Sequence, residues 1–445
     1  MRPSMQKLRQ QDVLWVAILA LGCVLLLIIQ AHPYTVDEFG NGLRADNVYF
    51  LRLATDGPSA CQEAPYCWRW LMPSLAHVVS LPGGASTELV QANYFALTAI
   101  FVWATGVVLY LLLRSYRLDR RYSALGMILY YSFGWATGFL FFFFWMSESL
   151  LFLLIVASLL CIRRGYYRAL VVLMIIGALT KETMLIVAPL YYTLNIRLGT
   201  APNSANEPVH DLSRAGSKPR LRSSRLRGLF DTGLIARTLL LVVVGVSVVI
   251  MVRLLTPTAN HYDMFEQVAY YVKARAEGTL ELPTVLLPGV VPTLPGAFLL
   301  GNVATYGFAL LLPFVALREN IGLAMRYSPF ILLVEAQLLV GSATERLLVY
   351  TFPVVVLMSV KGLKAIQSRM KIPFVWLALV PVGWFVITLG GIGWQWTFLE
   401  TQGVVLIAGL IGGILSAFRM QYRLRTAGRN TIDNPDAMTP QLPKA

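Results

Sequence analysis

Charged side chains are scarce in this sequence, where Asp, Glu, Lys and Arg together make up 13% of 445 residues. Soluble proteins carry about 25%, so the composition excludes an ordinary soluble protein. Hydrophobic residues make up 57% of the chain, and its mean hydropathy is +0.63. We therefore expect an all-helical protein that crosses a membrane several times.

Histidine and cysteine are also few, with four of each. Four histidines leave little material for a zinc site built on several imidazoles, although carboxylates could still hold a divalent cation. The sequence contains no GxxxxGK[ST] and no GxGxxG motif, which disfavours chemistry driven by ATP or by a nicotinamide. The sequence therefore indicates no particular cofactor, and dependence on a divalent metal stays open.

The formal net charge is +14. Binding to nucleic acid would explain it, but cytoplasmic Lys and Arg that orient a membrane protein explain it better. We therefore expect membrane lipids, and no nucleic acid, among the partners.

Twelve apolar runs predict a bundle of about twelve membrane spans. They lie at residues 13–30, 89–113, 122–145, 147–162, 168–180, 183–196, 237–255, 298–317, 327–342, 346–360, 373–391 and 404–418. Several are shorter than the roughly 20 residues that a straight span needs. Short helices can persist inside a bundle when they border a water-filled cavity.

The basic residues predict the orientation of this bundle. In the twelve-span arrangement, 29 of the 37 Lys and Arg residues lie on the side of the N-terminus, so both termini should be cytoplasmic. Residues 1–425 then form a single transmembrane domain, with external loops at 31–88 and 256–297. Residues 197–234 form a basic cytoplasmic loop, and residues 426–445 form a polar tail that we expect to be disordered.

Two adjacent carboxylates, Asp37 and Glu38, follow the first apolar run, where a helix would emerge into water. A solvated helix exit would explain them without any chemistry. We favour a reaction centre at this external surface, because most of the remaining polar residues at membrane depth fall on the same predicted side.

Three polar turns interrupt apolar runs on that side. The first contains Glu148, the second Lys181 and Glu182, and the third Glu345 and Arg346. Charged groups at such a depth usually face a cavity or a partner, so we expect the helices to ring a shared polar cavity.

Each of the first two turns also has a plainer explanation. Ser147 could cap the following helix, with Glu148 in its first turn. Lys181 and Glu182 could neutralise each other.

The first external loop predicts structure of its own. Residues 46–54 place Val48 and Leu51 on one helical face, which is typical of a helix lying in the membrane interface. Cys61 and Cys67 are six residues apart outside the cytoplasm, which fits a small loop closed by a disulfide.

Two further candidates lie in the external loops. Arg69 stands between two tryptophans; it could hold a phosphate by charge and fork geometry, or extend from a headgroup belt. His261 lies in the second external loop among acidic and basic residues, and it could line the cavity.

These features resemble the GT-C superfamily of integral membrane glycosyltransferases. Asp37-Glu38 resembles the Asp-Glu motif in the first external loop of protein O-mannosyltransferases and lipid A aminoarabinose transferases. Ser147-Glu148-Ser149-Leu150 is similar to a Ser-Glu-Ser-Leu run in a GPI-anchor mannosyltransferase. Thr180-Lys181-Glu182-Thr183 resembles a Thr-Arg-Glu-Thr segment of bacterial relatives, with Lys in place of Arg.

The resemblance implies an inverting transfer of a sugar, mannose-like or another hexose or pentose, from a polyprenyl-phosphate donor. The acceptor would be a lipid, a glycan or a protein at the external face of a bacterial inner membrane. Asp37 would be the general base, with Glu38 beside it for the acceptor or a metal. Arg69, Lys181 and Arg346 are candidate donor-phosphate ligands by placement only.

Three other interpretations stay open. A transporter or flippase for a lipid-linked or anionic solute would also have many spans and charged residues at membrane depth. An O-antigen-type polymerase and a non-catalytic assembly subunit are the remaining alternatives.

Overall fold

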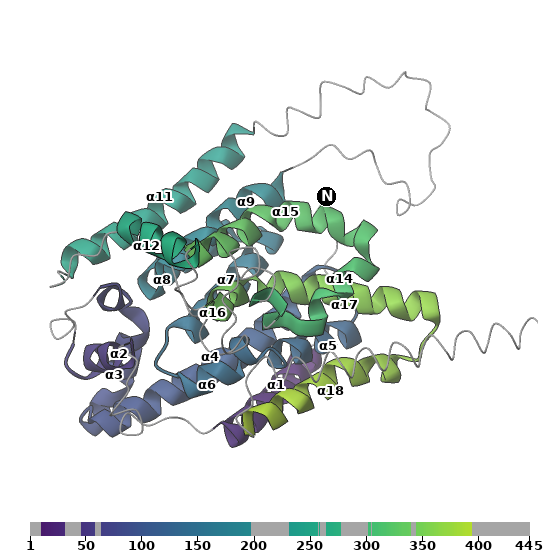
Figure 1. Cartoon of the computed structure of the whole chain (residues 1–445), viewed down its shortest axis with the longest axis horizontal. Coiled ribbons are helices and arrows are strands. Elements are labelled where there is room, and N and C mark those ends of the chain that lie inside the picture. Colours follow the sequence, from purple (N-terminus) through teal and green to yellow (C-terminus); the bar gives the residue numbers. More distant parts are fainter. Residues whose placement is uncertain are drawn as a thin grey trace, which may run out of the picture.

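The computed structural model describes residues 10–31, 46–57, 64–196, 231–256, 258, 264–276, 301–303, 305–339 and 344–393. Helices are the only regular secondary structure within these ranges (Figure 1). The α-helices are α1 (Gln10–Gln30), α2 (Asp46–Thr55), α3 (Leu71–Ser80), α4 (Thr87–Ser115), α5 (Arg120–Tyr131), α6 (Gly138–Phe142), α7 (Glu148–Arg164), α8 (Tyr167–Thr180), α9 (Ala188–Asn195), α11 (Thr232–Leu255), α12 (Met264–Ala276), α14 (Leu312–Val315), α15 (Leu317–Ala336), α16 (Thr344–Leu348), α17 (Phe352–Met370) and α18 (Phe374–Gly393).

Among the described residues, five helical stretches are long and apolar enough to cross a membrane. They are Gln11–Gln30, Thr87–Ser115, Thr232–Leu255, Arg346–Met370 and Phe374–Gly391. A sixth results if Gly307–Val315 and Leu317–Leu339, which meet at 114°, count as one bent span. The part of the chain that is described thus supports a multi-pass membrane protein with five or six spans, and not the twelve that the apolar runs predicted.

One predicted span, at 122–145, is interrupted between α5 and α6, and hydroxyl side chains bind carbonyls at the interruption. Helix α5 ends at Tyr131, and α6 contains only five residues. Between them, the Ser132 hydroxyl donates to the carbonyl of Ile128, and the Thr137 hydroxyl donates to those of Tyr131 and Phe133, at 3.0 Å each. Hydroxyls that bind nearby carbonyls compete with the regular helical pattern, so this apolar run does not form one straight helix.

Two other predicted spans form helices that are too short to cross a membrane. Helix α8 is apolar but has 14 residues. The run predicted at 183–196 divides into the 3₁₀ helix η5 (Glu182–Val187) and the eight-residue α9. The predicted span at 404–418 and the C-terminal tail lie outside the described residues, as do residues 197–230 of the basic loop, whose last residues begin α11.

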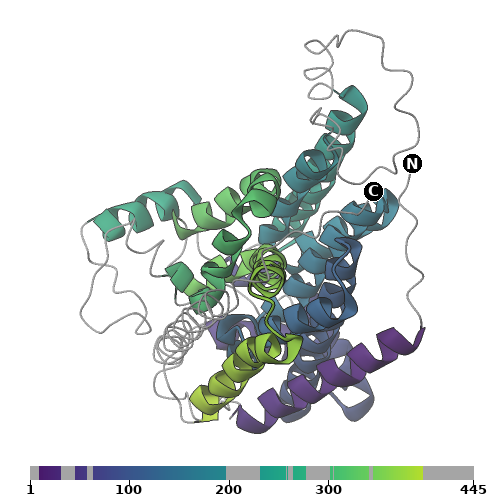
Figure 2. The same cartoon turned by 90° about the vertical axis from the view of Figure 1, so that its right-hand side faces the viewer.

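The core is formed by helices buried on most sides. Helix α4 packs along α7, and α17 packs against α5 and α14. In Figure 2, α17 runs toward the viewer in the middle of the molecule, with α1 (purple) and α18 (yellow-green) near one edge. Of the most apolar stretch in Arg346–Met370, 83% is buried, against 17% in Thr232–Leu255. α17 is therefore central and α11 peripheral.

The peripheral helices expose apolar side chains. Exposed residues include Trp15 and Ile18 on α1, Val243 on α11, and Trp376 and Val386 on α18. A surface of this kind is costly in water and favourable against lipid tails. It agrees with the membrane assignment from composition.

The first loop contains the helix expected at 46–54. Helix α2 covers Asp46–Thr55 and packs on α3, where Nδ1 of His77 lies 2.6 Å from the carbonyl oxygen of Ala54. Phe50 and Leu53 are buried and Leu51 is partly buried. At least part of the apolar face of α2 therefore covers protein.

Candidate functional site

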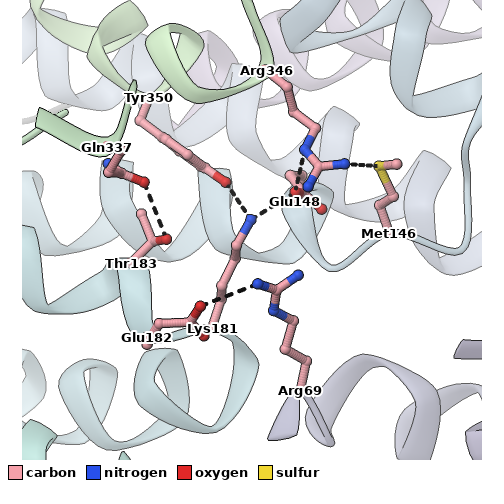
Figure 3. Close-up of polar contacts among 9 residues, drawn as sticks. All are labelled: Arg69, Met146, Glu148, Lys181, Glu182, Thr183, Gln337, Arg346 and Tyr350. Atoms are coloured by element: carbon pink, nitrogen blue, oxygen red, sulfur yellow. Dashed lines mark hydrogen bonds and ion pairs between the residues drawn. The ribbon is translucent and has the colours of Figure 1, made fainter. Parts of the chain in front are cut away.

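Charged side chains from four separate segments meet inside the helical bundle (Figure 3). Arg69 follows the short 3₁₀ helix η2 (Tyr66–Trp68), and Glu148 is the first residue of α7. Lys181 and Glu182 join α8 to η5, and Arg346 lies in α16. We call these five residues the charged cluster.

Lys181 and Glu148 form the centre of the charged cluster. Nζ of Lys181 donates to Oε1 of Glu148 at 2.8 Å, and each side chain is only 3% exposed. The same ammonium donates to the hydroxyl of Tyr350 at 2.9 Å. Nε of Arg346 lies 3.4 Å from Oε1 of Glu148, so two cations share this one carboxylate.

The first turn of α7 does not show the predicted cap. Ser147 precedes the helix, but its side chain makes no capping hydrogen bond, and its Oγ is buried without a partner. The expectation that Ser147 caps this helix is therefore wrong. Glu148 is held by charge pairing with Lys181 and Arg346.

Arg69 and Glu182 form a second ion pair beside the first. Nη2 of Arg69 lies 3.1 Å from Oε1 of Glu182, with the arginine side chain 9% exposed and the glutamate side chain 35% exposed. Lys181 and Glu182 thus each form their direct ion pair with a residue far away in sequence rather than with each other. Arg69 is buried inside the protein, so it does not extend from a headgroup belt.

The charged cluster carries more positive than negative charge, since three cations face two carboxylates. Burial lowers the pKa of Lys181 to about 8; Glu148 opposes this shift, while Arg69 and Arg346 add to it. Burial favours the neutral form of Glu182, but the charges of Arg69 and Lys181 outweigh it and lower the pKa of that carboxyl. Near neutral pH these five side chains together carry one net positive charge, and Arg69, Glu148 and Lys181 are buried.

Several buried polar atoms in or beside the charged cluster have no hydrogen-bond partner among the described residues. They include Nε of Arg69, Nε1 of Trp70 and Nε2 of Gln337. Gln337 also accepts a long hydrogen bond from the hydroxyl of Thr183, at 3.4 Å. Buried polar groups are nearly always paired in folded proteins, so unpaired donors beside an excess of positive charge are consistent with an anionic ligand.

The structure brings together five of the residues that the sequence singled out, Arg69, Glu148, Lys181, Glu182 and Arg346. Asp37, Glu38, Cys61 and His261 lie outside the described residues, and so does the side chain of Glu345. Cys67 is disulfide-bonded, whereas Cys23 and Cys161 are free.

Two neighbours of the charged cluster were not predicted. Tyr350 lies four residues after Arg346, a spacing that places both on one helical face, and this spacing could have identified it. Met146, whose Sδ is 3.8 Å from Nη1 of Arg346, has no comparable signal in the sequence.

Within the described ranges, no group of three or more His, Cys, Asp or Glu residues is placed to hold a metal ion. The cationic side chains instead suit an anion, because Arg presents a planar fork of donors and Lys a compact charge.

No family model matches the chain, and a search of curated proteins gave no significant match. What this protein does has to be inferred from its own residues.

Proposed function

We propose that this protein is a membrane glycosyltransferase that uses a polyprenyl-phosphate sugar, and that Arg69, Lys181 and Arg346 bind the donor's phosphate. The observation that carries the proposal is that three cationic side chains, Arg69, Lys181 and Arg346, converge with two carboxylates among the described residues. Burying charge costs several kcal/mol per ion unless it is compensated, and a bound phosphate would supply the missing negative charge. The GT-C-like motifs at Glu148 and at Lys181-Glu182 fall in the same cluster.

The proposed reaction needs a base and a stabilised leaving group. An acceptor hydroxyl attacks the anomeric carbon and gives its proton to Asp37, with Glu38 beside it. The bond between that carbon and the phosphate oxygen breaks, and its electron pair leaves with the lipid phosphate. The phosphate gains negative charge in this step, and fixed cations stabilise such developing charge.

The proposed setting is the external face of a bacterial inner membrane, with a lipid, glycan or protein as acceptor. It rests on the apolar helices and on the distribution of Lys and Arg in the twelve-span arrangement that the sequence predicts.

Transfer of radiolabelled sugar from polyprenyl-phosphate donors by the protein in lipid nanodiscs tests this proposal. Arg69→Ala should reduce donor binding and transfer by at least about tenfold, since a charge-assisted hydrogen bond contributes about 1.5–3 kcal/mol. Asp37→Asn should abolish transfer while donor binding persists. Arg52→Ala, which removes an exposed arginine of the same loop, is the matched control and should match wild type. Unchanged donor binding in Arg69→Ala would contradict the phosphate site.

A transporter of a lipid-linked or anionic solute is the second candidate. The bend of 114° between Gly307–Val315 and Leu317–Leu339 and the break between α5 and α6 favour it, because transporters build binding sites from interrupted helices. Uptake of a lipid-linked sugar into proteoliposomes without sugar transfer would support this function over the first.

A further inference from the structure

The two carboxylates of the charged cluster differ in how firmly they are held. Glu148 is 3% exposed and lies within 3.4 Å of both Lys181 and Arg346. The side chain of Glu182 is 35% exposed. Among the described residues it forms one ion pair, with Nη2 of Arg69 (Figure 3). Glu182 is the more exposed of the two carboxylates and pairs with one cation rather than two, so it is the carboxylate that can leave its cation at lower cost when another anion takes its place.

Arg69 also has donor capacity that Glu182 does not use. Its side chain is 91% buried, and its Nε has no hydrogen-bond partner within the part of the chain that the structure describes. A guanidinium forms its strongest contacts when two of its N–H groups bind two oxygens of one anion. A phosphate can supply both oxygens, whereas the carboxylate of Glu182 binds Nη2 with one.

We propose that Glu182 occupies the phosphate position of the empty site, and that the phosphate of the lipid donor displaces its carboxylate from Arg69. This inference rests on the proposed function. Glu182 would then be a positioning residue that keeps Arg69 in place without substrate and swings toward solvent when substrate binds.

The exchange changes the charge that the phosphate meets. With Glu182 in place, the charged cluster carries one net positive charge; with Glu182 withdrawn, Arg69, Lys181 and Arg346 face Glu148 alone, which leaves two. The donor phosphodiester carries one negative charge, and the departing lipid phosphate carries about −1.5 to −2 at pH 7. With Glu182 withdrawn, the charge of the site therefore matches the charge of the departing lipid phosphate better than that of the intact donor. Catalysis requires this, because a site speeds the reaction only if it binds the transition state more tightly than the substrate.

Isothermal titration of the full-length protein in nanodiscs with geranyl phosphate, a short isoprenyl monophosphate, tests the exchange. Glu182→Gln keeps the shape of the side chain but weakens its hold on Arg69. Removing a partly exposed competitor of this kind should tighten binding by about threefold to fivefold. Glu88→Gln removes one negative charge from an exposed position on α4 and should leave the affinity unchanged.

Further variants separate this inference from the proposed function. If Glu182→Gln does not fold, Glu182→Asp serves instead: its shorter side chain reaches Arg69 less well, so binding should again tighten, by a smaller factor. Suppose that wild type binds geranyl phosphate, that Arg69→Ala does not, and that the Glu182 variants bind as wild type does or more weakly. This result would overturn the exchange but support the phosphate site. Equal binding by wild type and Arg69→Ala, or no binding by either, would overturn both.

Discussion

Replacing Lys181 by Met should be among the most damaging single changes in the charged cluster. Met keeps much of the length of the side chain but removes its charge, so Glu148 loses a hydrogen bond of 2.8 Å and Tyr350 loses one of 2.9 Å. Removing one partner of a buried ion pair costs about 3–5 kcal/mol. Because Arg346 stays within 3.4 Å of Glu148, we expect the lower end, about 3 kcal/mol.

The reciprocal change and the double variant give the coupling between the two residues. Glu148→Gln leaves Lys181 beside Arg69 and Arg346 without its carboxylate, and it should also cost about 3–5 kcal/mol. The double variant buries two neutral side chains, so its cost should fall short of the sum of the single costs by at least about 2 kcal/mol.

Reversible unfolding of the purified protein in mixed detergent micelles would provide these free energies. The pair formed by Arg120 and Asp12 is a suitable control, because its atoms also lie 2.8 Å apart but the arginine side chain is 53% exposed. Its coupling should be about 0.2–1 kcal/mol. Additive costs at Lys181 and Glu148, or a coupling no larger than that of the control pair, would refute the view that the pair is buried and mutually dependent.

Two further predictions concern pH and packing. Since the pKa of Lys181 is about 8, its ammonium is charged below that pH and neutral above it. The affinity for geranyl phosphate should therefore fall between pH 7 and pH 9 in wild type but not in Lys181→Arg. Affinities that depend on pH in the same way in both proteins would contradict this. A Cβ added at Gly362 would lie 2.0 Å from the backbone oxygen of Leu312, so Gly362→Ala should destabilise the contact of α17 with α14 by about 1–3 kcal/mol. Gly322→Ala, at a position of α15 with open space, should be neutral or stabilise the protein by up to about 1 kcal/mol, and equal stability of the two variants would refute this close approach.

The long apolar helices could be predicted because hydropathy over some 20 residues determines them. The runs at 13–30, 89–113 and 237–255 each fall within a helix long enough to span. The run at 122–145 is also apolar, but it is interrupted between α5 and α6, where the hydroxyls of Ser132 and Thr137 bind backbone carbonyls. The Ser132 hydroxyl also donates to the carbonyl of Pro381 in α18 at 3.2 Å, a tertiary contact that no local pattern contains.

The charged cluster could be predicted in its members but not in its pairing. Charges within apolar runs identified Glu148, Lys181 and Arg346, because such residues are costly unless they meet a partner. The sequence offered Glu182 as the nearest partner for Lys181, yet the pair formed is with Glu148, 33 residues away. Which carboxylate a lysine reaches depends on how α7 and α8 pack, and local spacing does not determine that.

The most direct test of the phosphate site is a cryo-electron microscopy structure of the full-length protein in nanodiscs with geranyl phosphate. The proposal predicts phosphate density within hydrogen-bonding distance of Arg69, Lys181 and Arg346, with the carboxylate of Glu182 moved away from Arg69. Phosphate density elsewhere, with the pairs Arg69–Glu182 and Lys181–Glu148 both intact, would contradict it.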